Sequence, residues 1–257
     1  MSLFLRTTAL MLLVLSRAPA FAAVPFNSES DAKVGESKNQ LSSKLFKHSL
    51  SGLYGIQSTN NQPLQPYNDF EILYSKAHQA QRELETLCRS TALLTSTEAH
   101  FSGVKSRDRA LNKIEHELGG RADRITDLAR TTLVANDVPS LVEAYEVLSR
   151  EASIVKVKNR FKSPAASGYR DLNLLVQLPK TNVIAEVQLH LKAIADVKNG
   201  PEHRFYEQIQ KFERVAALEK RALHDIEKAQ INQFRRQSIE LYQNAWQPYI
   251  TTHIQAA

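Results

Sequence analysis

The chain has 257 residues, of which 42% are hydrophobic and 23% charged, with a formal net charge of +6 at neutral pH. These proportions are typical of a globular protein, and the length suits one core or a modest core with a helical annex. Cys88 is the only cysteine, which excludes an intramolecular disulfide. The fold must therefore be held by its hydrophobic core, or the protein must work in a reducing compartment.

Residues 1–22 are predicted to be a secretory signal peptide. Arg6 precedes a short apolar run, residues 9–15, and Ala20 and Ala22 match an A-x-A cleavage site. The run is too short to cross about 30 Å of hydrocarbon. We therefore expect cleavage after Ala22, export to the periplasm or the medium, and no stable membrane insertion afterwards. Loss of Arg6 and Arg17 leaves a net charge of 6 − 2, or +4.

Residues 23–66 are rich in Ser, Asn, Gln and Lys, which predicts a flexible leader with room for one short helix. Residues 67–250 are predicted to form one domain. Apolar residues recur at helical spacing from 67 to 100, so this stretch is one long amphipathic helix or two short ones. A second helix is expected at 105–118, ended by Gly119 and Gly120.

The period then changes to that of strands. Residues 124–135 and 154–161 alternate and are rich in β-branched types, and 167–178 with 183–191 form a hairpin around the PKTN loop. From Pro201 to Trp246 we expect helix throughout. The order of helix, helix, four strands and helices predicts an α+β fold, with a small sheet flanked by helices.

The hairpin has two very different faces. If Leu178 lies opposite Val183, the residue numbers of every cross-strand pair in the hairpin sum to 361. In this register one face of the hairpin is wholly apolar. The other face pairs Leu175 with Glu186, Asn173 with Gln188 and Asp171 with His190, and Tyr169 lies at its end. The pattern alone favours a solvated face over a functional site.

Charged residues elsewhere in the chain favour a functional site on this face. Lys105, Arg109 and Lys113 are spaced i, i+4 and i+8, which is unfavourable unless an anion lies against them. A second basic stripe has strand spacing: Lys156, Lys158, Arg160 and Lys162. Asp127 and Glu186 are acids at or within apolar strands, where they need a partner or a metal. Together these groups suggest a polyphosphate with Mg²⁺; the alternative is a solvated basic surface.

Four motifs in order resemble the synthetase domain of the RelA/SpoT family, which makes (p)ppGpp: VKSRDRALNKI, DLARTTLV, VKNRFKSPAASGYRDLNLLV and AEVQLHL. They cover residues of about 100–210. The resemblance implies a nucleotidyltransferase-like synthetase fold, a mixed sheet flanked by helices with helical N- and C-terminal extensions. It also implies transfer of the β,γ-pyrophosphate of ATP to the 3′-hydroxyl of an acceptor nucleotide.

The resemblance also implies roles for individual residues. Lys105, Lys113 and Arg109 are expected to bind the phosphates of ATP, and Asp127 and Glu186 to hold Mg²⁺, with Glu186 as catalytic base. Tyr169 matches the tyrosine that stacks on the acceptor base. The other acceptor residues are expected to be Arg170, Asn173, Gln188 and His190, with Lys158, Arg160 and Lys162 as phosphate-binding candidates.

The sequence departs from the family pattern mainly on the acceptor side. Asn173 and His190 stand where histidine and arginine are usual, and Ala165 and Ser167 replace a usual lysine and asparagine. Gly103 stands where an ATP-binding arginine is usual, and Arg107 or Arg109 is the candidate replacement. ATP use is therefore expected, while guanine specificity stays open.

Three hypotheses follow. The leading one is an exported pyrophosphokinase that uses GDP or GTP and acts as an effector or toxin in the cytosol of a recipient cell. The second keeps the chemistry but uses an adenine nucleotide or the 3′ end of a tRNA. The third is a degenerate nucleotide- or RNA-binding module without turnover. An immunity protein or self-association is the expected protein partner.

Overall fold

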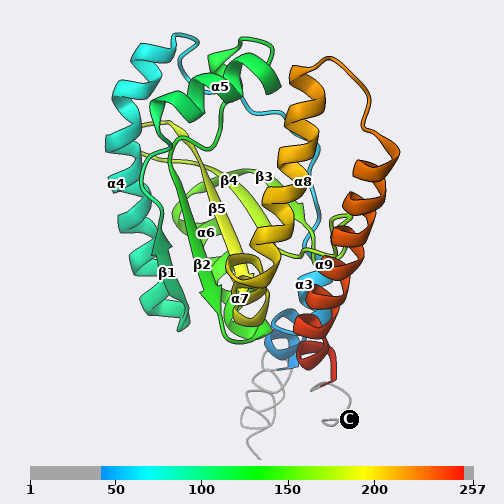
Figure 1. Cartoon of the computed structure of the whole chain (residues 1–257). Helices are drawn as coiled ribbons and strands as arrows, with labels where there is room; N and C mark the ends of the chain where they lie inside the picture. The colour runs from blue at the N-terminus through cyan, green and yellow to red at the C-terminus, as the bar shows by residue number, and fades with distance from the viewer. Residues whose placement is uncertain (1–41, 252–257) are drawn as a thin grey trace, which may run out of the picture. The chain divides into compact units, whose positions relative to one another are not determined.

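A five-stranded mixed sheet lies at the centre of the residues that the computed structural model describes, 42–251 (Figure 1). The predicted signal peptide and the first part of the predicted leader lie outside these residues. The described elements belong to one compact unit that starts at Ser43.

The sheet has the order β1-β2-β5-β4-β3. β2 and β5 are parallel and the other neighbours are antiparallel. The strands are β1 (Glu98–Phe101), β2 (Arg130–Ala135), β3 (Ser153–Asn159), β4 (Leu172–Gln177) and β5 (Ile184–Leu191). The mixed sheet flanked by helices confirms the predicted fold class.

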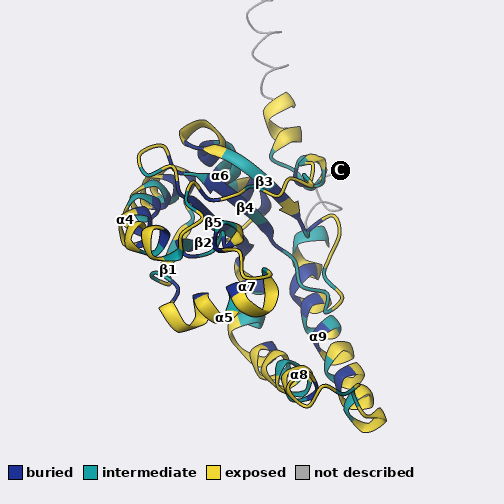
Figure 2. Ribbon diagram, turned by 90° about the horizontal axis from the view of Figure 1, so that it is seen from above, coloured by how far each residue is buried: buried dark blue, intermediate teal, exposed yellow. Residues whose placement is uncertain are grey.

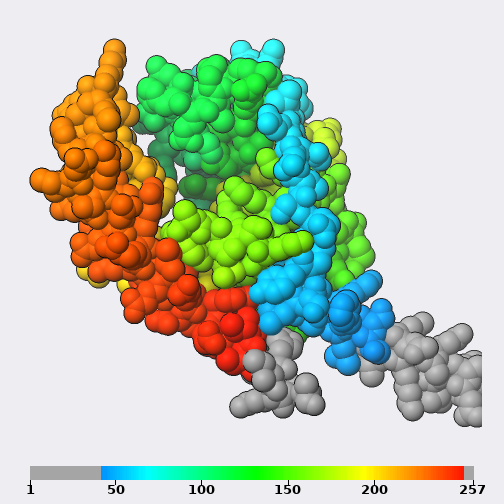
Figure 3. All heavy atoms as spheres, turned by 90° about the vertical axis from the view of Figure 1, so that its right-hand side faces the viewer, coloured from blue at the N-terminus to red at the C-terminus, as the bar shows by residue number. Residues whose placement is uncertain are grey.

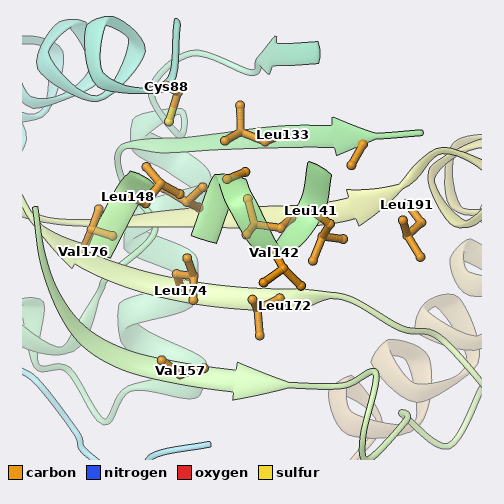
Figure 4. Close-up of a cluster of buried hydrophobic side chains, with 14 of the residues drawn as sticks. Cys88, Leu133, Leu141, Val142, Leu148, Val157, Leu172, Leu174, Val176 and Leu191 are labelled. Atoms are coloured by element: carbon orange, nitrogen blue, oxygen red, sulfur yellow. The ribbon is translucent and has the colours of Figure 1, made fainter. Parts of the chain in front are cut away.

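The hairpin of β4 and β5 has the predicted register. Leu174 pairs with Val187 and Glu186 with Leu175, and the backbone N–H of Leu178 donates to the carbonyl of Val183 over 3.0 Å. Its apolar face is fully buried against α6 (Val138–Glu151), as Figure 4 shows for Leu172, Leu174 and Val176 beside the helix. Burial of each such side chain contributes about 1.5–3 kcal/mol, which fixes the polar face on the opposite side.

Three sequence predictions for this region were wrong. The sequence predicted neither β1, an edge strand of four residues, nor α6, a helix that lies between two strands. The strand predicted from residue 124 begins only at Arg130, after a short 3-10 helix, η1 (Ala122–Arg124). Asp127 therefore lies in the extended connection that leads into β2, not within the strand.

The remaining helices largely follow the sequence pattern. α4 (Phe70–Thr95) is one long helix, and α5 (Arg107–Glu117) is followed by Gly119 and Gly120 at φ of +65° and +76°, as a helix end requires. The region after β5 is divided into α7 (Lys192–Asn199), α8 (Pro201–Leu218) and α9 (Asp225–Thr251). The helix expected to run unbroken from Pro201 is thus interrupted at residues 219–224.

The described part of the predicted leader is folded, which corrects the prediction of a flexible segment there. It contains α3 (Leu50–Gly55), whose Leu53 is fully buried in the main core. After α3, polar side chains bond to strand backbone: Thr59 Oγ1 accepts from the Val157 N–H over 3.0 Å. The polar composition that suggested flexibility therefore supplies hydrogen bonds to the edge of the sheet.

Buried residues are concentrated in the sheet and the inner helix faces, while α5 and α8 expose most of their surface (Figure 2). Tyr242 and Trp246 of α9 join the same core as the sheet. Between residues 42 and 251, no helix combines the length and the apolar character that a bilayer span needs.

Replacing Leu53 with alanine should destabilise the domain by about 2–5 kcal/mol, because it leaves a cavity in the main core. Leu45→Ala is the matched control, since that side chain is 66% exposed. Chemical denaturation of both variants measures the effect. Equal and small losses of unfolding free energy would show that this segment is not part of the core.

Candidate functional site

The polar face of the hairpin forms the floor of a cleft of about 770 Å³, which we call the sheet cleft. Figure 3 shows this side of the molecule, with α8 in orange facing α5 in green across a hollow. The cleft is lined by strand residues Arg130, Thr132, Asn173, Glu186 and Gln188, by Ala165, Ser167 and Tyr169 before β4, and by Arg109, Arg160, Lys198, Glu202, His203 and Tyr206 around its rim.

Asp127 lies between two lysines. Its Oδ2 is 2.9 Å from Lys113 Nζ and 3.0 Å from Lys105 Nζ. Burial raises the pKa of this carboxyl, but the hydrogen bond and charge of Lys113 and the charge of Lys105 outweigh it and hold the pKa below its usual value. The two predicted ATP lysines and the predicted metal aspartate are thus brought together.

The two lysines do not lie on one helix face as predicted, because Lys105 is outside the helix. Lys105 precedes α5 and its backbone N–H donates to the Leu128 carbonyl over 2.9 Å, beside Asp127. Lys113 reaches the same carboxylate from the helix. Both lysines and Arg109 also line a second, smaller pocket of about 460 Å³, the lysine pocket, to which α8 adds Arg214. Arg109 is shared by the two pockets.

The carboxylates fit a divalent cation. Asp127 Oδ1 is buried with no hydrogen-bond partner in the described structure, and an orphaned carboxylate oxygen is costly unless it binds a ligand. Carboxylate oxygens are the hard ligands that Mg²⁺ prefers. Within residues 42–251 no group of three or more His, Cys, Asp or Glu side chains gathers as a ready-made metal cluster. Mg²⁺ demands octahedral coordination, so two carboxylates would leave the other positions to substrate or water.

Glu186 is held toward the sheet cleft by its strand neighbours. The Asn173 side-chain amide donates to Glu186 Oε1 over 2.7 Å, and the Glu186 backbone N–H donates to the Ala129 carbonyl over 3.0 Å. Arg130 is its register partner on β2. Because Ala129 is two residues beyond Asp127, this backbone bond ties the segments that carry the two carboxylates.

Tyr169 is fixed by hydrogen bonds to the buried side chains of Asp171 and His190. Its hydroxyl donates to Asp171 Oδ2 over 2.9 Å and accepts from His190 Nε2 at 2.6 Å, while Arg160 Nη1 donates to Asp171 Oδ1 at 2.5 Å. Burial, then the charge of Lys198, depresses the pKa of His190, so we assign a neutral imidazole protonated on Nε2. His190 supports Tyr169 from behind and does not line the sheet cleft.

Lys198 also lines the sheet cleft, although it was not among the predicted site residues. Its ammonium donates to Gln188 Oε1 over 2.8 Å and lies 5.8 Å from the centre of the Tyr169 ring. Burial lowers the pKa of this lysine, against the charges of Asp171 and Glu186, which raise it. The available signal was its position in the last turn of the helix that folds back directly after the Glu186 strand.

Several predicted residues lie elsewhere. Lys158 and Lys162 are exposed and line neither pocket, and the charge of Arg160 lowers the pKa of Lys158. Arg170 donates to the Phe161 carbonyl and lies 5.0 Å from the Trp246 ring centre, outside the sheet cleft. The α9 tryptophan that draws Arg170 away could not be placed from sequence.

The stability of the domain should depend on pH through Asp127. The pKa of Asp127 is lower in the folded than in the unfolded protein. Its contribution to the free energy of unfolding is therefore present above about pH 4 and is lost as pH falls through the folded pKa. Asp127→Asn should therefore lower the unfolding free energy at pH 7 and approach the wild type in acid. Denaturation of both proteins from pH 7 to pH 3 measures this. A difference that does not change with pH would contradict it.

Two known proteins are similar to this chain in sequence. No family model matches the chain. It is 30% identical over 121 residues to the (p)ppApp synthetase toxin Tas1 of Pseudomonas aeruginosa (strain UCBPP-PA14), covering 47% of this chain and 27% of the relative. It is 30% identical over 118 residues to the GTP pyrophosphokinase YwaC of Bacillus subtilis (strain 168), covering 41% and 56%. The chain therefore spans about a quarter and just over half of these relatives.

Solved structures share the fold. The Type VI effector Tas1, in complex with its immunity protein, aligns with a TM-score of 0.52 at 21% identity, covering 69% of this chain and 96% of that one. Small alarmone synthetase 2 from Bacillus subtilis aligns with a TM-score of 0.50 at 21% identity, covering 70% and 92%. The chain is therefore similar in sequence to two synthetases, and it shares its fold with the Tas1 effector and with small alarmone synthetase 2.

Proposed function

We propose that this domain is a nucleotide pyrophosphokinase, which moves the β,γ-pyrophosphate of ATP to the 3′-hydroxyl of an acceptor nucleotide. The observation that carries the proposal is the Asp127 carboxylate between Lys105 and Lys113, next to a cleft whose floor presents Glu186. The names of the two curated relatives support the same chemistry. A pyrophosphate donor needs cations for its phosphates and hard oxygens for its metal, and both are present.

The ATP phosphates are assigned to the lysine pocket. Lys105, Lys113 and Arg109 line it together, and they supply the positive charge that a triphosphate requires. Arg109 is the better replacement for the arginine missing at Gly103. Arg107 is bound to Glu71 through its two terminal guanidinium nitrogens and lies over the Phe70 ring, whereas Arg109 lines both pockets.

Asp127 and Glu186 are the residues that would hold Mg²⁺. A bound Mg²⁺ neutralises charge on the phosphates and polarises them. Asn173 orients Glu186 by its hydrogen bond to Oε1. Glu186 is then placed to accept the proton of the 3′-hydroxyl as the new O3′–Pβ bond forms. The bond between the β-phosphorus and the oxygen that bridges it to the α-phosphorus breaks, and AMP leaves with that oxygen.

The acceptor is assigned to the part of the sheet cleft between Tyr169 and Glu186. Tyr169, held by Asp171 and His190, offers a ring against which a base can stack. Arg160 and Lys198 lie 5.7 Å and 5.8 Å from the centre of that ring, and both are hydrogen-bond donors only. Guanine offers two acceptors, O6 and N7, on one edge, which favours GDP or GTP.

An adenine nucleotide is the second candidate. The relative named a (p)ppApp synthetase toxin is as similar in identity to this chain as the relative named a GTP pyrophosphokinase. Gln188 and Asn173 carry amides that can also pair with the edge of adenine. Nothing in the described residues favours a tRNA 3′ end over a free nucleotide.

Export and a protective partner belong to the same proposal. The pattern of residues 1–22 supports secretion, and use of ATP then requires delivery to a cytosol. The Tas1 structure named above is a complex with an immunity protein, which supports a corresponding partner here.

Glu186→Gln tests the catalytic assignment. The amide keeps the shape of the carboxylate but cannot take the proton or the metal, so turnover should fall about 10²- to 10⁴-fold while the melting temperature stays near wild type. Glu240→Gln, an exposed change on α9, is the control. Pyrophosphate transfer and melting are measured on the same preparations, and a folded Glu186→Gln protein with wild-type turnover would end the proposal.

Lys198→Met tests the acceptor side. Methionine keeps most of the volume and removes the charge, so KM for the acceptor should rise about 10- to 100-fold while KM for ATP changes little, because a charged hydrogen bond is worth about 1.5–3 kcal/mol. Lys192→Met on the same helix is the matched control, since Lys192 is exposed and pairs with Asp196. Equal increases in both KM values would contradict this role.

A further inference from the structure

The segment between α3 and α4 binds to two separate parts of the sheet. At its start, the Thr59 N–H donates to the Val157 carbonyl over 2.9 Å, and the Asn61 amide donates to the Val155 carbonyl over 3.1 Å. At its end, the Gln65 N–H donates to the Asp123 carbonyl of η1 over 2.7 Å. We call residues 57–66 the strap; Figure 3 shows this stretch, in blue to cyan, running along the molecule.

Gln65 is the residue through which the strap enters the interior. Its side chain is 5% exposed, and its amide makes three bonds to backbone atoms. Nε2 donates to the carbonyls of Ile125, over 2.7 Å, and Ile184, over 2.8 Å, and Oε1 accepts from the Ile184 N–H over 2.9 Å. One amide thus joins the segment before β2 to the first residue of β5.

These two attachment points have equal offsets from the carboxylates. Ile125 is two residues before Asp127, and Ile184 is two residues before Glu186. The ladder between β2 and β5 starts only at Arg130 and Glu186, preceded by the Glu186 N–H bond to Ala129. Before the two carboxylates in sequence, backbone pairing does not join these two segments. There the Gln65 amide connects Ile125 to Ile184.

We propose that Gln65 is a positioning residue that fixes the spacing of Asp127 and Glu186, so that both carboxylates can hold one divalent cation. The proposal rests on the proposed function, because it assigns the metal to these two residues. Gln65 lines neither the sheet cleft nor the lysine pocket and so does not touch substrate. It acts through the backbone of the two segments that carry the carboxylates.

Two roles of Gln65 can be distinguished by experiment: positioning the two carboxylates, or only supplying hydrogen bonds to buried backbone groups. If Gln65 only satisfied those groups, its loss would lower stability and leave metal binding unchanged in the folded fraction. If it sets the spacing, its loss should weaken metal binding about 10- to 100-fold, as supporting groups around metal ligands commonly do, and lower kcat with little change in the acceptor KM.

The test measures Mn²⁺ binding by the full chain and its variants at a temperature where all are folded. Binding is monitored through the electron paramagnetic resonance signal of the free Mn²⁺. Gln65→Leu removes the amide, and Gln65→Asn keeps an amide with a shorter reach, in case the first variant does not fold. Asn61→Ala removes a bond of the same kind from the same strap, and Leu53→Ala provides a destabilised core with Gln65 intact.

We expect weaker Mn²⁺ binding and lower kcat for the folded Gln65 variant, with both controls near wild type. A Gln65 variant that melts earlier but binds Mn²⁺ and turns over as wild type would overturn the positioning role alone. Mn²⁺ affinity in wild type that Asp127→Asn does not reduce would overturn the metal assignment of the proposed function, and the role of Gln65 with it. These two failures are therefore distinguishable.

Discussion

The register of the β4–β5 hairpin is the constraint on which the rest of the site depends. Each strand alternates, so a slip of one residue would turn the buried aliphatic side chains to the cleft and bury Glu186. The aliphatic face is packed against α6, whose Leu141, Val142 and Leu148 are buried in the same core. Ordinary hydrophobic burial thus orients the Glu186 carboxylate, and Asn173 needs only to hold its end in place.

Electrostatics then divides the surface around that face into two regions. On one side, Asp127 neutralises part of the charge of Lys105 and Lys113 and keeps both ammonium groups in one small region. On the other, the buried Asp171 carboxylate binds both Arg160 and Tyr169 and holds the tyrosine ring at the cleft. A donor with several phosphates and an acceptor with one base would meet these regions differently, and Glu186 lies between them.

Much of the fold and part of the site could be predicted because they rest on local patterns. The hairpin register follows from period-two alternation, and Glu186 was singled out by the cost of an acid within an apolar strand. Asp127 was singled out on the same ground but lies before β2, not within it. For Lys198, which bonds to Gln188 ten residues before it, the sequence offered only its position in the last turn of α7. Gln65 could not be predicted, since its amide bonds to Ile184, 119 residues away, and only tertiary packing brings the two together. Arg170 was misplaced for the same reason, because the ring of Trp246 on α9 attracts it.

The most direct measurement is the fate of ATP when the protein is incubated with it and with GDP or ADP in separate reactions. The account predicts one AMP released for each acceptor converted, and a product that carries the new pyrophosphate on its 3′-oxygen, identified by mass spectrometry and phosphorus NMR. Formation of ADP with inorganic phosphate, or no consumption of ATP with any nucleotide acceptor, would contradict it.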